Sequence, residues 1–112
     1  VDLVGLAHEV VLPPGHYGTV ISTELLEHDP HWLKTVEMML FWLRPGGALL
    51  ITCATDGRAP HGLGDQGYGP DRAYYRNLSV EETYKRLEAL GYRFTRSERD
   101  GVDILCFPKE RV

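Results

Sequence analysis

Apolar residues recur at helical spacing from residue 32 to residue 43, and this stretch carries the clearest pattern in the chain. The apolar positions are Trp32, Leu33, Val36, Met39, Leu40 and Leu43. Steps of three and four residues place them on one face of a helix. Asp29 suits the N-cap and Pro30 the first helical position, where a missing N–H costs nothing. The Pro-Gly-Gly sequence at residues 45–47 is predicted to end this helix.

Short apolar runs predict β-strands at residues 1–5, 19–23 and 48–54. The last of these runs is continuously apolar, which is typical of a parallel strand covered on both faces. A second helix is predicted to begin after Ser79, because Glu82 follows three residues later and completes a capping box. Gly91 is the expected end of that helix.

The last part of the chain predicts an antiparallel β-hairpin. Residues 92–98 alternate between apolar and polar, Asp100-Gly101 is a strong two-residue turn signal, and residues 102–107 return as the partner strand. Strands that alternate with helices indicate an α/β layered sheet. A length of 112 residues suits one domain.

Composition and charge narrow the classes of partner. The net charge of −4, from 12 basic and 16 acidic residues, argues against binding to a nucleic-acid backbone. No apolar run approaches the roughly 18 residues of a membrane span, and no signal-peptide pattern is present. Cys53 and Cys106 lie in apolar runs and are predicted to be buried free thiols of a reducing compartment, so a cytoplasmic location is expected. A first residue that is not Met suggests a processed, truncated or partial reading frame.

Two motifs carry a family resemblance. Residues 16–28 read HYGTVISTELLEH and residues 43–51 read LRPGGALLI. Together with the C-terminal hairpin and the Ala7-His8-Glu9 stretch, they resemble the class I S-adenosylmethionine-dependent methyltransferases of the type 11 family. The first motif resembles the fourth strand and the loop after it, and the second resembles the turn into the fifth strand. The resemblance covers nearly the whole chain.

The resemblance implies a Rossmann-like methyltransferase sheet that is N-terminally truncated and ends in the antiparallel hairpin. Residues 1–112 then form a partial methyltransferase domain, because the glycine-rich cofactor turn and the acidic residue for the ribose hydroxyls are not in this sequence. Leu6 stands where the family often has an Asp that meets the adenine amine. The implied function is methyl transfer from S-adenosylmethionine to a small-molecule or sugar-like acceptor. The alternative is a non-catalytic remnant that folds and self-associates without binding cofactor.

Candidate cofactor residues follow from the same resemblance and lie near the third-strand and fourth-strand segments. They are Ala7, His8, Ser22, Thr23, Glu24 and His28. The plainer interpretation of residues 22–24 is a hydrogen-bonded turn that leads into a helix. A metal shared by His28 and His31 is not expected, because the predicted helix begins between them.

The stretch from residue 55 to residue 78 is long for a loop, and long loops within a domain are usually functional or disordered. In the resembled family this region shapes the acceptor pocket. The candidate acceptor residues are Arg58, Tyr74, Tyr75 and Asn77. His61 is the candidate catalytic base, because imidazole changes charge near neutral pH. The alternative is a solvated loop in which the tyrosines only attach it to the core.

The missing segments also predict self-association. In the resembled fold, residues 19–23 form an interior strand, and without its neighbour this strand has an open edge. Open edges pair with other strands. A homodimer is therefore expected, and the rival is a repair in which residues 1–5 pair with residues 19–23 of the same chain.

Overall fold

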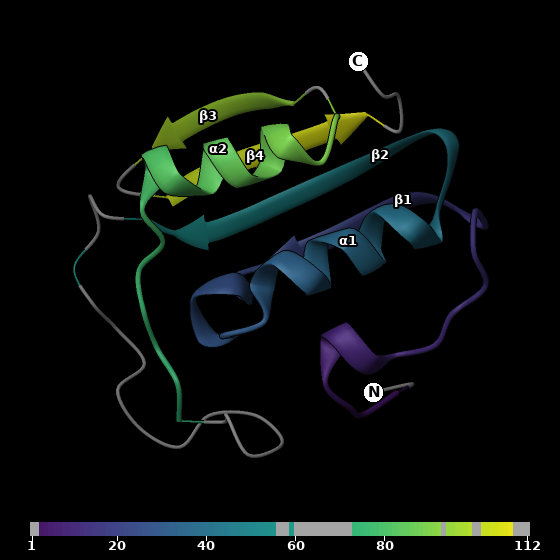
Figure 1. The fold of residues 1–112 in the computed structure, drawn as a ribbon, viewed down its shortest axis with the longest axis horizontal. Helices are drawn as coiled ribbons and strands as arrows, with labels where there is room; N and C mark the ends of the chain where they lie inside the picture. Colours follow the sequence, from purple (N-terminus) through teal and green to yellow (C-terminus); the bar gives the residue numbers. More distant parts are fainter. Residues whose placement is uncertain (1–2, 56–58, 60–72, 93, 100–101, 109–112) are drawn as a thin grey trace.

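The computed structural model describes residues 3–55, 59, 73–92, 94–99 and 102–108 (Figure 1). Its elements follow the order η1, β1, η2, α1, β2, α2, β3 and β4. The 3-10 turns are η1 (Ala7–Glu9) and η2 (Leu26–His28), and the helices are α1 (Trp32–Trp42) and α2 (Val80–Ala89). The strands are β1 (Tyr17–Thr23), β2 (Leu43–Ala54), β3 (Thr95–Arg99) and β4 (Val102–Pro108).

The four strands form one sheet in the order β1-β2-β4-β3. β1 and β2 are parallel, whereas β4 is antiparallel to both β2 and β3. The strand predicted from residue 92 begins at Thr95. Asp100 and Gly101 lie outside the described residues, so the predicted two-residue turn stays a prediction. The α/β sheet expected from the sequence is confirmed.

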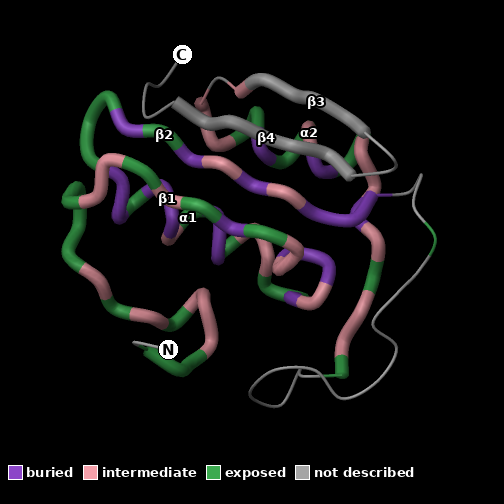
Figure 2. Tube along the Cα trace, turned by 180° about the vertical axis from the view of Figure 1, so that it is seen from behind, coloured by how far each residue is buried: buried purple, intermediate pink, exposed green. Residues whose placement is uncertain are grey.

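Both helices pack on the same face of the sheet (Figures 1 and 2). Leu49, Ile51 and Cys53 alternate along β2 and are buried in a common core with Val36 of α1 and Leu87 of α2. Cys53 is a buried free thiol, as predicted. In the described residues, the opposite face of β1 and β2 has no helix over it. The prediction that residues 48–54 are covered on both faces is therefore wrong for the structure that the described residues form.

The exposed face is clearest along β1, whose side chains alternate in burial (Figure 2). Ser22 is buried, whereas Thr19, Ile21 and Thr23 are exposed, and Ile21 retains 62% of its surface. β1 is also the edge strand of the described sheet. The predicted open edge at residues 19–23 is thus confirmed for this sheet.

The N-terminal segment differs from its prediction. Leu3, Val4 and Gly5 are not in a strand, and all three are exposed. Val1 and Asp2 lie outside the described residues. An apolar run of five residues next to a turn carries too little periodicity to separate a strand from extended coil. The described part of this segment, residues 3–5, therefore does not pair with β1 as a neighbouring strand.

The beginning of α1 lies two residues later than predicted, and His31 rather than Asp29 is its N-cap residue. Asp29 is nevertheless bound to this helix start, because its Oδ1 accepts a hydrogen bond from the His31 N–H at 2.8 Å. Its other oxygen accepts from the Thr35 hydroxyl. Pro30 and His31 form a turn before the helix, so the aspartate acts from outside it.

The predicted second helix and its Ser79 cap are confirmed. Ser79 is the N-cap of α2, and its hydroxyl accepts a hydrogen bond from the Glu82 N–H at 3.4 Å. The helix ends before Gly91, whose N–H donates to the Glu88 carbonyl at 2.9 Å. No helix among the described residues is long and apolar enough to cross a membrane.

Candidate functional site

The carboxyl ends of β1 and β2 lie side by side, because the two strands are parallel and Thr23 is paired with Thr52. This edge is where open α/β sheets place their ligands. The chain leaves β1 through Glu24, whose φ of 53° is unusual for a residue with a side chain. The Glu24 N–H donates to the Thr52 carbonyl at 2.8 Å. A hydrogen bond to the neighbouring strand thus maintains a backbone conformation of the kind found at functional sites.

The three candidate residues of this turn do not share one surface. Thr23 is exposed, Glu24 is half-buried, and Ser22 is buried on the face that the helices cover. The Ser22 hydroxyl has no hydrogen-bond partner among the described residues. The structure therefore places these residues next to one another at the strand end, with their side chains in different environments.

η2 brings a carboxyl group into the interior behind this turn. Glu27 has no exposed surface, and its Oε2 accepts a hydrogen bond from the Ala54 N–H at 3.2 Å. The backbone carbonyl of Glu27 accepts from the Arg76 N–H at 2.8 Å. The neighbouring His28 has its Nε2 3.9 Å from Glu27 Oε1. One residue thus joins η2, the end of β2 and the segment before α2.

The segment before α2 lies along the end of β2 and carries three candidate acceptor residues. Leu78 forms a parallel bridge with Thr55. The Tyr75 ring lies 5.2 Å from the His28 ring at an angle of 60°, and the Tyr75 hydroxyl donates to Asn77 Oδ1. The structure therefore brings together one candidate cofactor residue, His28, and two candidate acceptor residues.

Tyr74 and Asn77 also line a small groove between the starts of the two helices. Its volume is about 200 Å³, and Trp32, Arg76 and Arg86 are among the other lining residues. Arg58 and His61 lie outside the described residues, so their predicted roles stay predictions.

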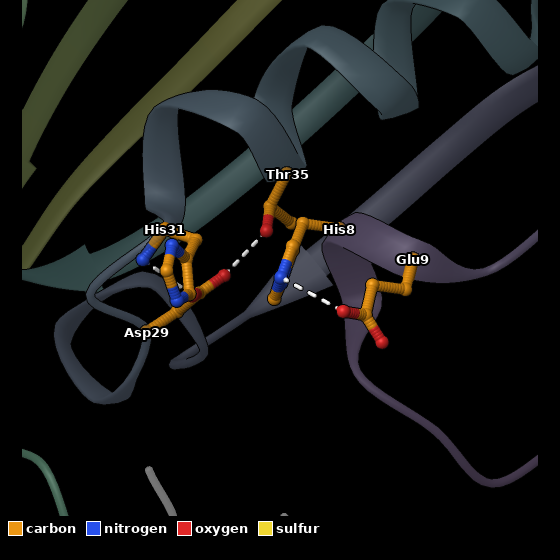
Figure 3. Close-up of polar contacts among 5 residues, drawn as sticks. All are labelled: His8, Glu9, Asp29, His31 and Thr35. Carbon is orange, nitrogen blue, oxygen red and sulfur yellow. Dashed lines mark hydrogen bonds and ion pairs between the residues drawn. The ribbon is translucent and has the colours of Figure 1, made fainter. Parts of the chain in front are cut away.

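Ala7 and His8 lie on η1, which packs against α1. The His8 ring lies 4.3 Å from the His31 ring, at an angle of 34° (Figure 3). His8 Nε2 is 3.7 Å from Glu9 Oε1. The structure places His8 against the start of α1, so its side chain contributes to the docking of the N-terminal segment. Among the described residues, no group of three His, Cys, Asp or Glu side chains is arranged to bind a metal.

Sequence reasoning missed two polar residues of this region. Glu27 stands within the motif of residues 16–28, but nothing in the local sequence pattern marks it as a buried carboxyl group. Thr35 lies on the apolar face of α1, three residues after Trp32 and four before Met39. A hydroxyl on an apolar face needs a partner, and the Asp29 carboxyl group supplies it.

Solved structures of known proteins share this fold. A SAM-dependent methyltransferase from Thermotoga maritima superposes with a TM-score of 0.69 at 11% identity, over 96% of this chain and 63% of its own. The 1,6-didemethyltoxoflavin-N1-methyltransferase of Burkholderia thailandensis was solved with 1,6-didemethyltoxoflavin and S-adenosylhomocysteine. It superposes with a TM-score of 0.57 at 17% identity, over 90% of this chain and 46% of its own. The (4+2)-cyclase SpnF gives a TM-score of 0.67 at 14% identity, over 95% and 54%.

The chain therefore has part of the fold seen in the class I S-adenosylmethionine-dependent methyltransferases. It spans about half to two thirds of the length of the three proteins named above. No protein-family model and no curated protein matches the sequence. Identities this low show the fold alone, and the presence of a cyclase among the similar structures illustrates that one fold supports different chemistry.

Proposed function

We propose that this chain is part of a methyltransferase domain of the type 11 kind, which transfers a methyl group from S-adenosylmethionine to a small-molecule or sugar-like acceptor. The observation that carries the proposal is the contact between His28 and Tyr75. His28 lies in the cofactor-side loop, residues 22–28, and Tyr75 lies in the acceptor-side segment, residues 75–78. Both segments lie at the carboxyl ends of parallel strands. Methyl transfer chiefly requires alignment of the acceptor with the methyl group, and two adjoining segments supply such alignment. A cytoplasmic location is part of the same proposal.

The described residues fit only part of S-adenosylmethionine. Residues 22–24 offer backbone and hydroxyl groups at the strand end, and the buried Ser22 hydroxyl has unused hydrogen-bonding capacity among the described residues. Leu6 has no acceptor atom for the adenine amine, and the sequence contains neither a glycine-rich turn nor a ribose carboxylate in the positions of the family pattern. The residues present therefore do not complete a cofactor site. In this proposal, Tyr75 and Asn77 orient the acceptor.

We expect the 112-residue chain to show no micromolar binding of S-adenosylmethionine in isothermal titration calorimetry. The physical reason is that the ribose and adenine contacts have no counterpart in the sequence. A dissociation constant in the micromolar range would overturn this expectation and would show that the chain holds the whole cofactor.

A titration with S-adenosylhomocysteine, followed by amide chemical shifts, separates the two functions. Shifts at Ser22, Thr23 and Glu24 at millimolar ligand would support the methyltransferase proposal, because they would reveal a residual contact at the strand end. Shifts elsewhere, or none, would favour the alternative of a non-catalytic remnant.

The alternative function is self-association, and the edge of β1 favours it. Glu24 directs its N–H toward β2, so by strand alternation Thr19, Ile21 and Thr23 direct their main-chain groups away from the sheet. The same three residues have exposed side chains. No charged residue occurs in β1, so two copies can pair in an antiparallel manner without like charges meeting. A two-fold dimer is the commonest way to satisfy such an edge.

We expect light scattering of the chain at tens of micromolar to give the mass of a dimer. Ile21→Asp should return it to a monomer with unchanged helix content, because the new carboxylate would lie at the paired edge. Phe41→Asp is the matched control, since Phe41 is a similarly exposed apolar residue at the end of α1. A monomer mass for the unmodified chain, or equal effects of the two substitutions, would contradict the dimer through β1.

A further inference from the structure

The carboxyl group of Glu27 lies in an unusual environment for an ionisable side chain. It has no exposed surface, and the adjacent Leu26 belongs to the apolar core. Burial of a carboxyl group is unfavourable unless hydrogen bonds compensate for the lost water. An apolar side chain of similar size would often serve stability equally well at such a place. The polar group therefore requires an explanation in terms of what its hydrogen bonds position.

The side chain of Glu27 connects η2 with the last residue of β2. Its Oε2 accepts the Ala54 N–H at 3.2 Å across 27 positions of the sequence. Ala54 is completely buried, so water cannot replace Glu27 as the partner of this N–H. The hydrogen bond thus fixes the distance between the turn after β1 and the end of β2.

The same two residues bind the acceptor-side segment through their backbones. The Glu27 carbonyl accepts from the Arg76 N–H at 2.8 Å, and the Ala54 carbonyl accepts from the Leu78 N–H at 3.0 Å. Asn77 and Tyr75 flank Arg76, so both are placed by these two bonds. The separation of the two attachment points is set by the bond between Glu27 and Ala54.

We propose that Glu27 is a positioning residue that holds the acceptor-side segment, residues 75–78, in register with the cofactor-side loop, residues 22–28. The meaning of this register for catalysis rests on the proposed function, whereas the register itself does not. Without the carboxyl group, the distance between the Glu27 and Ala54 carbonyl groups, which bind the segment, is no longer fixed. Movement of η2 then displaces His28 from Tyr75, and the two sides of the site lose their alignment. A shift of one ångström at such a site is enough to lower a rate strongly.

Amide hydrogen exchange on the 112-residue chain tests this positioning directly. We expect Glu27→Ala to accelerate exchange at the Arg76 and Leu78 amides by about tenfold. The loss of one hydrogen bond lowers the local free energy of opening by an amount that corresponds to about this factor. Amides in the middle of α1, such as Met39, should keep their rates. Glu27→Gln should restore slow exchange, because its amide oxygen can still accept from Ala54 N–H.

The control substitution is Glu37→Ala on α1, where the side chain is 43% exposed and pairs with Lys34 at 3.8 Å. It should leave the Arg76 and Leu78 rates unchanged. Glu27→Asp keeps a carboxyl group but withdraws it by one methylene, so it should accelerate the same two amides and covers the case in which Glu27→Ala does not fold.

Two results would overturn the positioning role. Uniform acceleration of all slow amides in Glu27→Asp, including Met39, would show that Glu27 only contributes to global stability. Unchanged exchange at Arg76 and Leu78 would show that the segment is held without it. The experiment contains no cofactor or acceptor, so its outcome is independent of the S-adenosylhomocysteine titration that tests methyl transfer.

Discussion

Gly47→Ala should lower the free energy of unfolding by about 3 kcal/mol, as expected when a side chain is forced into occupied space. A methyl group on Gly47 would stand 2.8 Å from the Gly18 carbonyl oxygen and 2.9 Å from the Arg44 carbonyl oxygen. Both atoms belong to the backbone, so relief of the clash requires Gly18 of β1 to move away from β2 and the start of β2 to bend at Arg44. The crowding arises because the register of the two strands shifts between Tyr17 and Thr19 at this point.

Gly46→Ala is the matched control, since the two glycines are adjacent in the Pro-Gly-Gly sequence. Gly46 has a φ of 76° and open space around it, so alanine there meets only backbone strain of about 1 kcal/mol. Chemical denaturation of the two variants measures the difference. Equal losses, or a larger loss for Gly46→Ala, would show that β1 and β2 are less closely packed at Gly47 than the structure indicates.

These two glycines also show how far the sequence could predict the fold. The Pro-Gly-Gly sequence predicted the end of the first helix, which is confirmed because α1 ends at Trp42. It did not predict that β2 begins at once with Leu43 and contains the three residues. That outcome depends on the backbone of β1, which passes close to Gly47. Contacts between strands are not encoded in local periodicity.

Local signals succeeded where the physical cause is local. The Ser79 cap and its partner Glu82 are three residues apart, so the sequence contains the whole interaction. The buried Glu27 depends on Ala54, which lies 27 positions away, and no spacing rule reveals such a pair. The candidate site was therefore predicted as two separate groups of residues. Only the structure shows that His28 from one group contacts Tyr75 from the other.

The one-sided sheet leads to the second large effect. Ile51→Ala should lower the free energy of unfolding by about 3 kcal/mol, as usual for a buried isoleucine in a well-packed core. Ile51 has no exposed surface and lies in the core formed under α1 and α2. The same run of apolar residues contains Leu50, which faces the other way and is only half-buried. Leu49, Ile51 and Cys53 are buried while Leu50 and Thr52 are only half-buried, so the unbroken apolar run wrongly predicted a strand covered on both faces.

Ile21→Ala is the matched substitution on the uncovered face, since Ile21 is paired with Leu50 in the neighbouring strand. At low micromolar protein it should cost about 1 kcal/mol or less, the range of strand preference at an exposed position. At higher concentration the cost should rise if β1 forms the dimer edge, because association stabilises the folded state by mass action. Denaturation of both variants at two protein concentrations measures the loss in free energy of unfolding and its dependence on concentration. A loss for Ile21→Ala as large as that for Ile51→Ala in the monomer would mean that the second face of the sheet is covered within one chain.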